Sequence, residues 1–278
     1  MMRDCVTYRT LGPGRMLPLM KRTTTRLALL LLTASGCTPG PREATRPHDG
    51  ETMSQRILIA TTSHDKKGST GEPTGAYLPE IAHPYEVFSR AGFTVELASV
   101  RGGAIPLDGV SDADAASTAF LEAHRDELQK SLAADAVDPA RYDAIYFAGG
   151  HGAMWDLPDN AAFARVASAI YERGGAVAAV CHGPAALVNV RLADGSYLLA
   201  GKRVSAFTND EERAVKLDAV VPFLLADKLE ERGARHDPAP LWQKKVVVSD
   251  RLVTGQNPAS AAGVAEAVVS VLRPPPPR

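Results

Sequence analysis

The sequence predicts an α/β domain in which a mostly parallel sheet is covered by helices on both faces. Short apolar runs alternate with segments of helical periodicity from residue 56 to residue 272, which is the pattern of repeated strand–helix–strand units. Residues 176–180 are apolar at every position, as a central parallel strand must be. The 278 residues are 45% hydrophobic and 23% charged, close to the globular average, which excludes a disordered or fibrous chain.

The expected elements follow one another in a regular order. Strands are expected at 57–60, 94–98, 142–147, 176–180 and 204–207, followed by a hairpin at 246–248 and 252–254. Helices are expected at 74–91, 112–132, 160–173, 211–232 and 259–272. Gly92 and Gly174 are placed to end the helices before them, because glycine readily adopts the left-handed conformation that closes a helix. Pro222 is expected to interrupt the helix that contains it.

The N-terminal residues have the pattern of a signal peptide. Basic residues at 21–26 precede an apolar run at 27–34, which is shorter than the ~20 residues that span a bilayer. The run ends in Ala-Ser-Gly-Cys, which resembles the lipidation site of bacterial lipoproteins. We therefore expect an exported, periplasmic protein with a lipid anchor at Cys37. If this N-terminal segment does not belong to the natural protein, the alternative is a cytoplasmic location.

Four segments follow from these patterns. A signal peptide at 1–36 precedes a flexible tether at 37–54 that is rich in Pro, Thr and Glu, an α/β domain at 55–272 and a frayed tail at 273–278. Lys and Arg number 31 against 32 for Asp and Glu, so the basic excess of nucleic-acid-binding proteins is missing and no such partner is expected. With the signal peptide removed and Cys37 lipidated, the mature chain would keep one free thiol, that of Cys181.

The junction after the predicted central strand carries the strongest chemical signal. Cys181 comes directly after residues 176–180 and is followed by His-Gly-Pro, in which glycine permits a tight turn and Pro184 suits a first helical turn. A cysteine in this turn lies at the carboxyl end of the sheet, where open α/β folds bind ligands. The helix N-terminus is expected to lower the pKa of the thiol. Cys181 is therefore predicted to be a nucleophile, with His182 beside it as a general acid or base.

The sequence around this cysteine, Ala-Val-Cys-His-Gly-Pro-Ala-Ala at 179–186, resembles the nucleophile elbow of the ThiJ/PfpI superfamily. Other blocks carry the resemblance over residues 56–272: Thr-Gly-Ala-Tyr-Leu-Pro-Glu at 74–80, Gly-Gly-His-Gly-Ala-Met-Trp-Asp at 149–156, Ala-Phe-Thr-Asn-Asp-Glu-Glu at 206–212 and Thr-Gly-Gln-Asn-Pro at 254–258. The resemblance implies a flavodoxin-like three-layer sandwich of the class I glutamine amidotransferase-like type. It is strongest to the branch of stress chaperones with glutathione-independent glyoxalase (glyoxalase III) activity.

The resemblance also implies a role for each catalytic residue. Cys181 would be the nucleophile and His182 its general base. Glu80 would be the acidic partner of the cysteine, and burial beside the sulfur should raise the pKa of its carboxyl. Glu212 would orient the histidine, although the neighbouring acids at 210–211 (Asp210 and Glu211) fit the same position in the sequence.

The glycine-rich loop after the third predicted strand holds the remaining candidates. In this fold the loop lies beside the elbow, so the N–H groups of Gly150 and His182 would form an oxyanion hole, with Gly152 completing the substrate loop. His151 either faces the substrate or packs within the loop. No cluster of His, Cys and Asp has a metal-ligand spacing, so neither a metal nor a cofactor is expected.

The implied reaction converts a small carbonyl substrate, a 2-oxoaldehyde such as methylglyoxal, to a 2-hydroxy acid such as D-lactate. This is a D-lactate dehydratase-like, hydro-lyase activity that depends on a cysteine. We also expect a homodimer. Two alternatives remain open: a holdase chaperone of the stress response without essential catalysis, which would need an exposed apolar patch, and a cysteine peptidase or amidohydrolase with the same Cys–His–Glu geometry.

Overall fold

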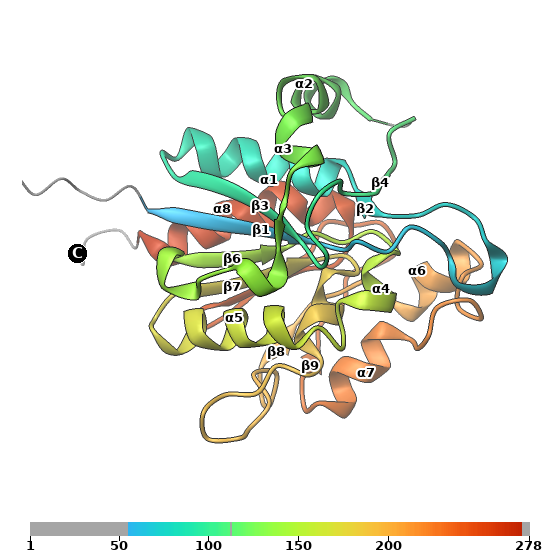
Figure 1. Ribbon diagram of the computed structural model, residues 1–278. Helices are drawn as coiled ribbons and strands as arrows, with labels where there is room; N and C mark the ends of the chain where they lie inside the picture. Colours follow the sequence, from blue (N-terminus) through green and yellow to red (C-terminus); the bar gives the residue numbers. More distant parts are fainter. Residues whose placement is uncertain (1–54, 112, 274–278) are drawn as a thin grey trace, which may run out of the picture. The chain divides into compact units, whose positions relative to one another are not determined.

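The structure is a computed structural model that describes residues 55–111 and 113–273 (Figure 1). The predicted signal peptide, tether and lipidation site at Cys37 lie outside the described residues, as does the tail from residue 274. Within the described ranges, no helix is both long enough and apolar enough to span a membrane.

A seven-stranded sheet organises the described residues. Its strand order is β10-β11-β7-β6-β1-β3-β5, and every neighbouring pair is parallel except β10 and β11. The strands are β1 (Arg56–Thr61), β3 (Thr94–Ser99), β5 (Leu132–Ala133), β6 (Ala144–Phe147), β7 (Ala176–Val180), β10 (Val246–Ser249) and β11 (Leu252–Gly255). The predicted α/β fold with a mostly parallel sheet is confirmed.

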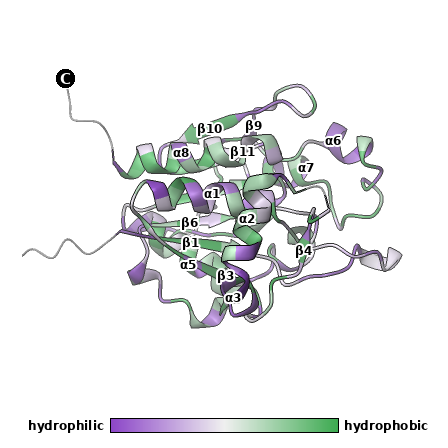
Figure 2. Cartoon of the chain, turned by 90° about the horizontal axis from the view of Figure 1, so that it is seen from above, coloured by the Kyte–Doolittle hydropathy of each residue, from purple (hydrophilic) through white to green (hydrophobic). Residues whose placement is uncertain are grey.

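Helices cover both faces of this sheet. Figure 1 shows α5 (Ala161–Glu172) on one face and α1 (Pro79–Arg90) with α8 (Ala261–Leu272) on the other. Side chains alternate along each central strand, so Leu58 of β1 packs into the core under α5 and Ile59 into the core under α1 and α8. Figure 2 shows α1 and α8 side by side, with α8 coloured mostly as hydrophobic.

The remaining elements are short and lie in the connections. The helices are α2 (Ala115–Ala123), α3 (Arg125–Gln129), α4 (Ala153–Asp156), α6 (Asn209–Ala214) and α7 (Leu225–Glu231). Two small parallel sheets pair β2 (Ala76–Tyr77) with β4 (Leu107–Asp108) and β8 (Arg203–Val204) with β9 (Arg235–His236). The 3-10 helices are η1 (Gly68–Thr70), η2 (Ala134–Ala136), η3 (Pro139–Arg141), η4 (Gly183–Leu187) and η5 (Pro258–Ser260).

The first predicted helix begins later than expected. It starts at Pro79 instead of residue 74, because Ala76–Tyr77 pair as β2 and the N–H of Ala76 donates to the carbonyl of Pro106 at 2.8 Å. Proline suits the first turn of a helix, where its missing N–H would be unpaired. The predicted helical end is confirmed, since Gly92 follows α1 with φ +81°.

Three other expected elements differ from the structure. The helix expected at 112–132 is two helices, α2 and α3, separated at His124. The strand expected at 204–207 is wrong: β8 pairs with β9 outside the central sheet, and apolar alternation cannot show which sheet a strand joins. The helix expected at 211–232 is α6 and α7, with no helix between them around Pro222.

The sheet gathers the candidate residues at one edge. Parallel strands β6, β7 and β11 all run in the same direction, so the residues after them share the carboxyl edge of the sheet. The loop at 149–152 follows β6, Cys181 follows β7, and Asn257 follows β11.

Candidate active site

Cys181 occupies a strained turn directly after β7. Its φ of +58° lies in the left-handed region, which is uncommon for residues other than glycine. The turn is fixed on both sides, since the N–H of Cys181 donates to the carbonyl of Gly255 and its carbonyl accepts from the N–H of Phe207, each at 3.0 Å. A Cβ at Gly183 would lie 2.3 Å from the carbonyl oxygen of Phe147, so only glycine fits there.

The protonation of this sulfur differs from the expectation. Burial first, and then the neighbouring Glu80, raise the pKa of the Cys181 thiol well above its usual value. The backbone N–H groups of Gly150 and His182 point to the sulfur and lower the pKa by less. The helix that follows, η4, is one 3-10 segment of five residues, which is too short for a strong dipole. The predicted lowering of the pKa is therefore wrong, and the resting sulfur is a thiol.

Glu80 approaches the sulfur from the first turn of α1. Its side chain is fully buried, and its Oε2 accepts a hydrogen bond from the N–H of Gly149 at 2.8 Å. Burial raises the pKa of Glu80 to about 8, although its contacts with Cys181 and Gly149 act in the opposite direction. Oε1 accepts no hydrogen bond from the described residues. At neutral pH, Glu80 is therefore a carboxylic acid beside the thiol.

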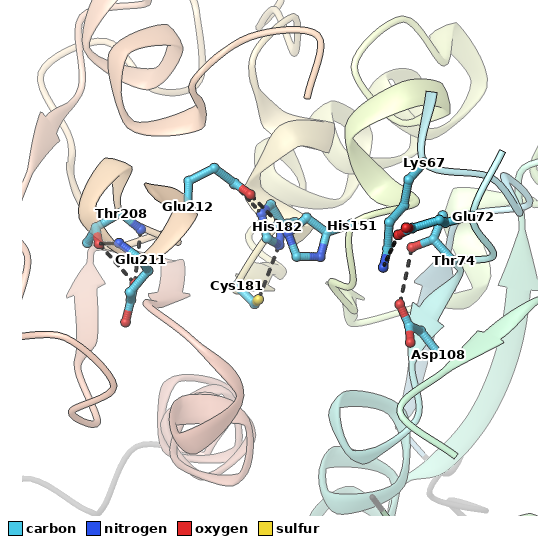
Figure 3. A network of polar contacts seen from close by, with 10 residues as sticks. All are labelled: Lys67, Glu72, Thr74, Asp108, His151, Cys181, His182, Thr208, Glu211 and Glu212. Atoms are coloured by element: carbon cyan, nitrogen blue, oxygen red, sulfur yellow. Dashed lines mark hydrogen bonds and ion pairs between the residues drawn. The ribbon is translucent and has the colours of Figure 1, made fainter. Parts of the chain in front are cut away.

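Two histidines share the carboxylate of Glu212 (Figure 3). Nε2 of His182 lies 2.8 Å from Oε2, and Nε2 of His151 lies 2.9 Å from Oε1. Burial alone would raise the pKa of Glu212, but the hydrogen bonds of the two histidines outweigh it and lower the pKa to about 2. Burial, followed by the charge of His151, lowers the pKa of His182 to about 4. Glu212 is therefore ionised and His182 is neutral.

This arrangement makes His182 a base for the thiol. Because Nε2 faces the carboxylate of Glu212, it carries the proton, and the other ring nitrogen, Nδ1, has a free lone pair. Nδ1 lies 3.4 Å from Sγ of Cys181. The thiol can donate its proton to Nδ1, as in other cysteine–histidine pairs.

The structure shows which of the three candidate acids at 210–212 contacts His182. Glu212 is the acid that contacts His182. Glu211 is equally buried but faces away, and its Oε1 accepts from the backbone N–H of Trp242 at 2.9 Å. Asp210 is exposed and pairs with Arg213 at 2.7 Å.

The glycine-rich loop is only partly at the site. Gly150 and His151 line the cavity above Cys181, and a Cβ at Gly150 would lie 2.4 Å from the carbonyl oxygen of Gly75. The structure does not place Gly152 on the cavity, contrary to the prediction. A Cβ at Gly152 would lie 2.7 Å from the carbonyl oxygen of His64, so this glycine permits close packing of the loop.

A cavity of about 400 Å³ opens above these residues. Its base is lined by Glu80, Gly150, His151, Cys181 and His182, and the rest of its lining is Tyr77, Phe207, Val215, Trp242, Asn257, Pro258 and Ala259. None of these outer residues was among the site residues predicted from the sequence. One signal was present, because Trp242 is one of two tryptophans in a chain with 6% aromatic residues and follows two prolines in a predicted loop.

His151, His182 and Glu212 could also hold a metal ion, since their ligand atoms all lie within 4.8 Å of one another. In the arrangement described, Nε2 of each histidine is hydrogen-bonded to Glu212. A metal bound at these Nε2 atoms would have to replace both hydrogen bonds to Glu212. The expectation that no metal or cofactor is required stays a prediction.

Known proteins are similar to this chain in sequence and in fold. Glyoxalase 3 of Candida albicans is 31% identical over 230 residues, which cover 77% of this chain and 97% of that protein. Glutathione-independent glyoxalase HSP31 of Saccharomyces cerevisiae is 31% identical over 235 residues, 79% of this chain and 98% of that protein. Among solved structures, the Rapid Encystment Protein 24 kDa of Francisella tularensis has a TM-score of 0.76 at 39% identity, over 78% of this chain and 99% of that one.

The predicted export to the periplasm is wrong against these comparisons, because the similar curated proteins are yeast proteins named as glyoxalases. The residues on which that prediction depended, 1–54, lie outside the described part of the chain.

The chain can be assigned to a protein family, because a family's sequence pattern matches most of the domain, including the elbow at Cys181 and most strands of the central sheet. The sequence pattern of the DJ-1/PfpI family matches residues 74–271, which include α1 with Glu80, the elbow at Cys181 and the start of α6 with Glu212. The chain belongs to the DJ-1/PfpI family.

Proposed function

We propose that this protein is a glutathione-independent glyoxalase that converts a 2-oxoaldehyde such as methylglyoxal to a 2-hydroxy acid at Cys181. The observation that carries the proposal is a thiol held between a protonated carboxyl group and a neutral imidazole at the base of a cavity. The names of the similar yeast proteins, glyoxalase 3 and glutathione-independent glyoxalase, support the same reaction.

The first step joins the sulfur to the substrate. Sγ of Cys181 forms a bond to the aldehyde carbon, C1, while the thiol proton passes to Nδ1 of His182. The electron pair of the C1 carbonyl moves onto its oxygen, which the N–H groups of Gly150 and His182 stabilise before it takes the proton of Glu80. The product is a hemithioacetal, with Glu80 as a carboxylate and His182 as an imidazolium that Glu212 stabilises.

The following steps move hydrogen from C1 to C2. Glu80, now a base, removes the C1 proton, and His182 returns its proton to the oxygen of C2, which gives an enediol. Glu80 then delivers its proton to C2 and takes the proton of the C1 oxygen, which leaves a thioester on Cys181. Water hydrolyses the thioester, releases the 2-hydroxy acid and restores the thiol. C1 is oxidised as C2 is reduced, so the balance needs one water and no external oxidant or reductant.

The lining of the cavity explains why glutathione takes no part. Glutathione carries two carboxylates, which a protein site normally pairs with Arg or Lys. The described residues that line the cavity include neither Arg nor Lys. The sulfur that glutathione would supply is already present at Cys181.

The test is turnover without added thiol. The full-length protein incubated with methylglyoxal is expected to form lactate at the same rate with and without glutathione, measured by lactate production against a reaction without enzyme. A rate that rises from the blank only when glutathione is present contradicts the proposal, as does a rate that never exceeds the blank.

Glu212 is expected to be the acid that supports His182. In Glu212→Gln, the imidazolium that forms during addition loses its charged partner, so kcat is expected to fall roughly 100-fold. The matched control is Asp210→Asn, which removes an exposed acid two residues earlier and should leave kcat unchanged. Equal kcat values for Glu212→Gln and Asp210→Asn would show that the carboxylate has no catalytic part.

A further inference from the structure

The outer part of the cavity differs in character from its base. The base holds Glu80, His151, Cys181 and His182, and the only other titratable residue that the described structure places on the lining is Tyr77. Outside them lie Phe207, Val215, Trp242 and Pro258, whose side chains are apolar or aromatic. The cavity therefore has a polar end that suits two adjacent carbonyl groups and a mostly apolar outer end, whose described lining residues carry no charged side chain.

The one amide side chain in the outer part is already engaged with the protein. Nδ2 of Asn257 donates to Glu211 at 2.8 Å and to the carbonyl of Gln243 at 3.0 Å, and its Oδ1 accepts from Ser260 at 3.3 Å. Its hydrogen-bonding atoms are thus used inside the protein, which keeps this wall apolar toward a substrate.

An aromatic wall connects the catalytic base to the cavity mouth. The ring of Phe207 lies 4.3 Å from the ring of His182, and the ring of Trp242 lies 5.8 Å from that of Phe207, at an angle of 58°. These separations are in the range of favourable aromatic contacts. Trp242 is 47% exposed, so its ring forms the rim of the cavity instead of filling the core.

The segment that carries Trp242 is held in place by hydrogen bonds to a buried side chain, that of Glu211. Trp242 has a φ of +64°, and its backbone N–H donates to Oε1 of Glu211, a carboxylate with no exposed surface. The same oxygen accepts from Gln256 at 3.0 Å and from Asn257. The other oxygen of Glu211 accepts from Thr208, as Figure 3 shows. One buried carboxylate therefore ties the segment that bears Trp242 to α6 and to the end of β11.

We infer that Trp242, with Phe207 and Val215, forms a subsite for the non-reacting group of the substrate, and that the enzyme prefers 2-oxoaldehydes with an aryl-sized apolar group, such as phenylglyoxal, to methylglyoxal. This inference rests on the proposed function. Cavities of 300–1,000 Å³ commonly hold drug-sized ligands, so the methyl group of methylglyoxal leaves most of the 400 Å³ here unfilled. An aryl group reaches Phe207 and Trp242, and this remote contact supplies binding energy that the reaction can use.

Steady-state kinetics on two substrates test the inference. The ratio of kcat/KM for phenylglyoxal to kcat/KM for methylglyoxal is expected to exceed one in the full-length protein and to fall roughly tenfold in Trp242→Ala. The matched control is Leu241→Ala, because Leu241 is 43% exposed and adjacent but does not line this cavity. Its ratio should equal that of the unmodified protein. Initial rates are needed, since phenylglyoxal slowly modifies arginine. Equal losses for both substrates in Trp242→Ala would overturn the subsite.

A binding measurement separates this inference from the proposed function. Calorimetry on Cys181→Ser compares 2-hydroxyacetophenone with hydroxyacetone, two ketones without an aldehyde to react. The aryl ketone is expected to bind at least about tenfold more tightly, and this preference should disappear when Trp242→Ala is added. A preference that persists in the double variant, or that never exists, overturns the subsite even if methylglyoxal is turned over. An aryl preference in a protein without turnover supports the subsite and rejects the glyoxalase.

Discussion

Replacing Cys181 with serine is expected to lower the rate of 2-hydroxy acid formation roughly 10⁴-fold or more, to the rate of the blank. Serine has the same shape, but its hydroxyl is far less acidic than a thiol. Burial lowers the pKa of His182 to about 4, so its imidazole takes a proton from an alcohol far less readily than from the more acidic thiol. The measurement is lactate production from methylglyoxal over hours at high enzyme concentration.

The structure supplies two controls for this result. Cys181→Ala should have the same residual rate as Cys181→Ser, because both lack the sulfur. The thermal unfolding midpoint of each variant should stay close to that of the unmodified protein, since the turn is fixed by backbone hydrogen bonds to Gly255 and Phe207. A folded Cys181→Ser that keeps a few per cent of the activity would show that the sulfur is not the nucleophile.

The local sequence was sufficient to predict the elbow. Residues 176–180 are apolar throughout, and the Cys-His-Gly-Pro that follows contains the glycine that a close approach to Phe147 requires. These features depend on a few consecutive residues, so a single sequence shows them. The same holds for the helical end at Gly92.

Features that depend on distant segments were not predictable in this way. The pKa of Cys181 was expected to fall, because the following helix could be seen in the sequence but the burial of the sulfur and its contact with Glu80 could not. Glu211 and Glu212 are adjacent and chemically identical, and only the packing of α6 turns one toward His182 and the other toward Trp242. The same limit applies to β8, whose pairing partner lies about thirty residues later in the chain.

Glu80→Gln is expected to lower kcat roughly 1,000-fold. Glutamine has the shape of the protonated carboxyl group, and its carbonyl oxygen can still accept from the N–H of Gly149. It can neither give a proton to the C1 oxygen nor remove the proton from C1. In the unmodified protein, activity is expected to fall as the pH rises through about 8, because Glu80 then ionises before the substrate reacts.

The same substitution is expected to stabilise the fold at high pH. Burial raises the pKa of Glu80 from 4.5 to about 8, so the folded state binds a proton that the unfolded state releases. The protonation of Glu80 makes its full contribution to the free energy of unfolding below pH 4.5, and this contribution is lost as the pH rises through 8. Between pH 5 and pH 8, the unmodified protein should therefore lose roughly 3 kcal/mol of unfolding free energy relative to Glu80→Gln.

Urea unfolding at pH 5 and pH 8 measures this difference in unfolding free energy. Both pH values lie below the usual pKa of 9.0 for a cysteine, so the ionisation of Cys181 does not contribute to the difference. Glu86→Gln is the matched control, since Glu86 lies on the same helix with a half-exposed side chain paired to Arg90. It should follow the pH dependence of the unmodified protein, because a surface ion pair is worth little. If Glu80→Gln has that same pH dependence, then Glu80 is ionised in the folded state and cannot be the acid that protonates the hemithioacetal.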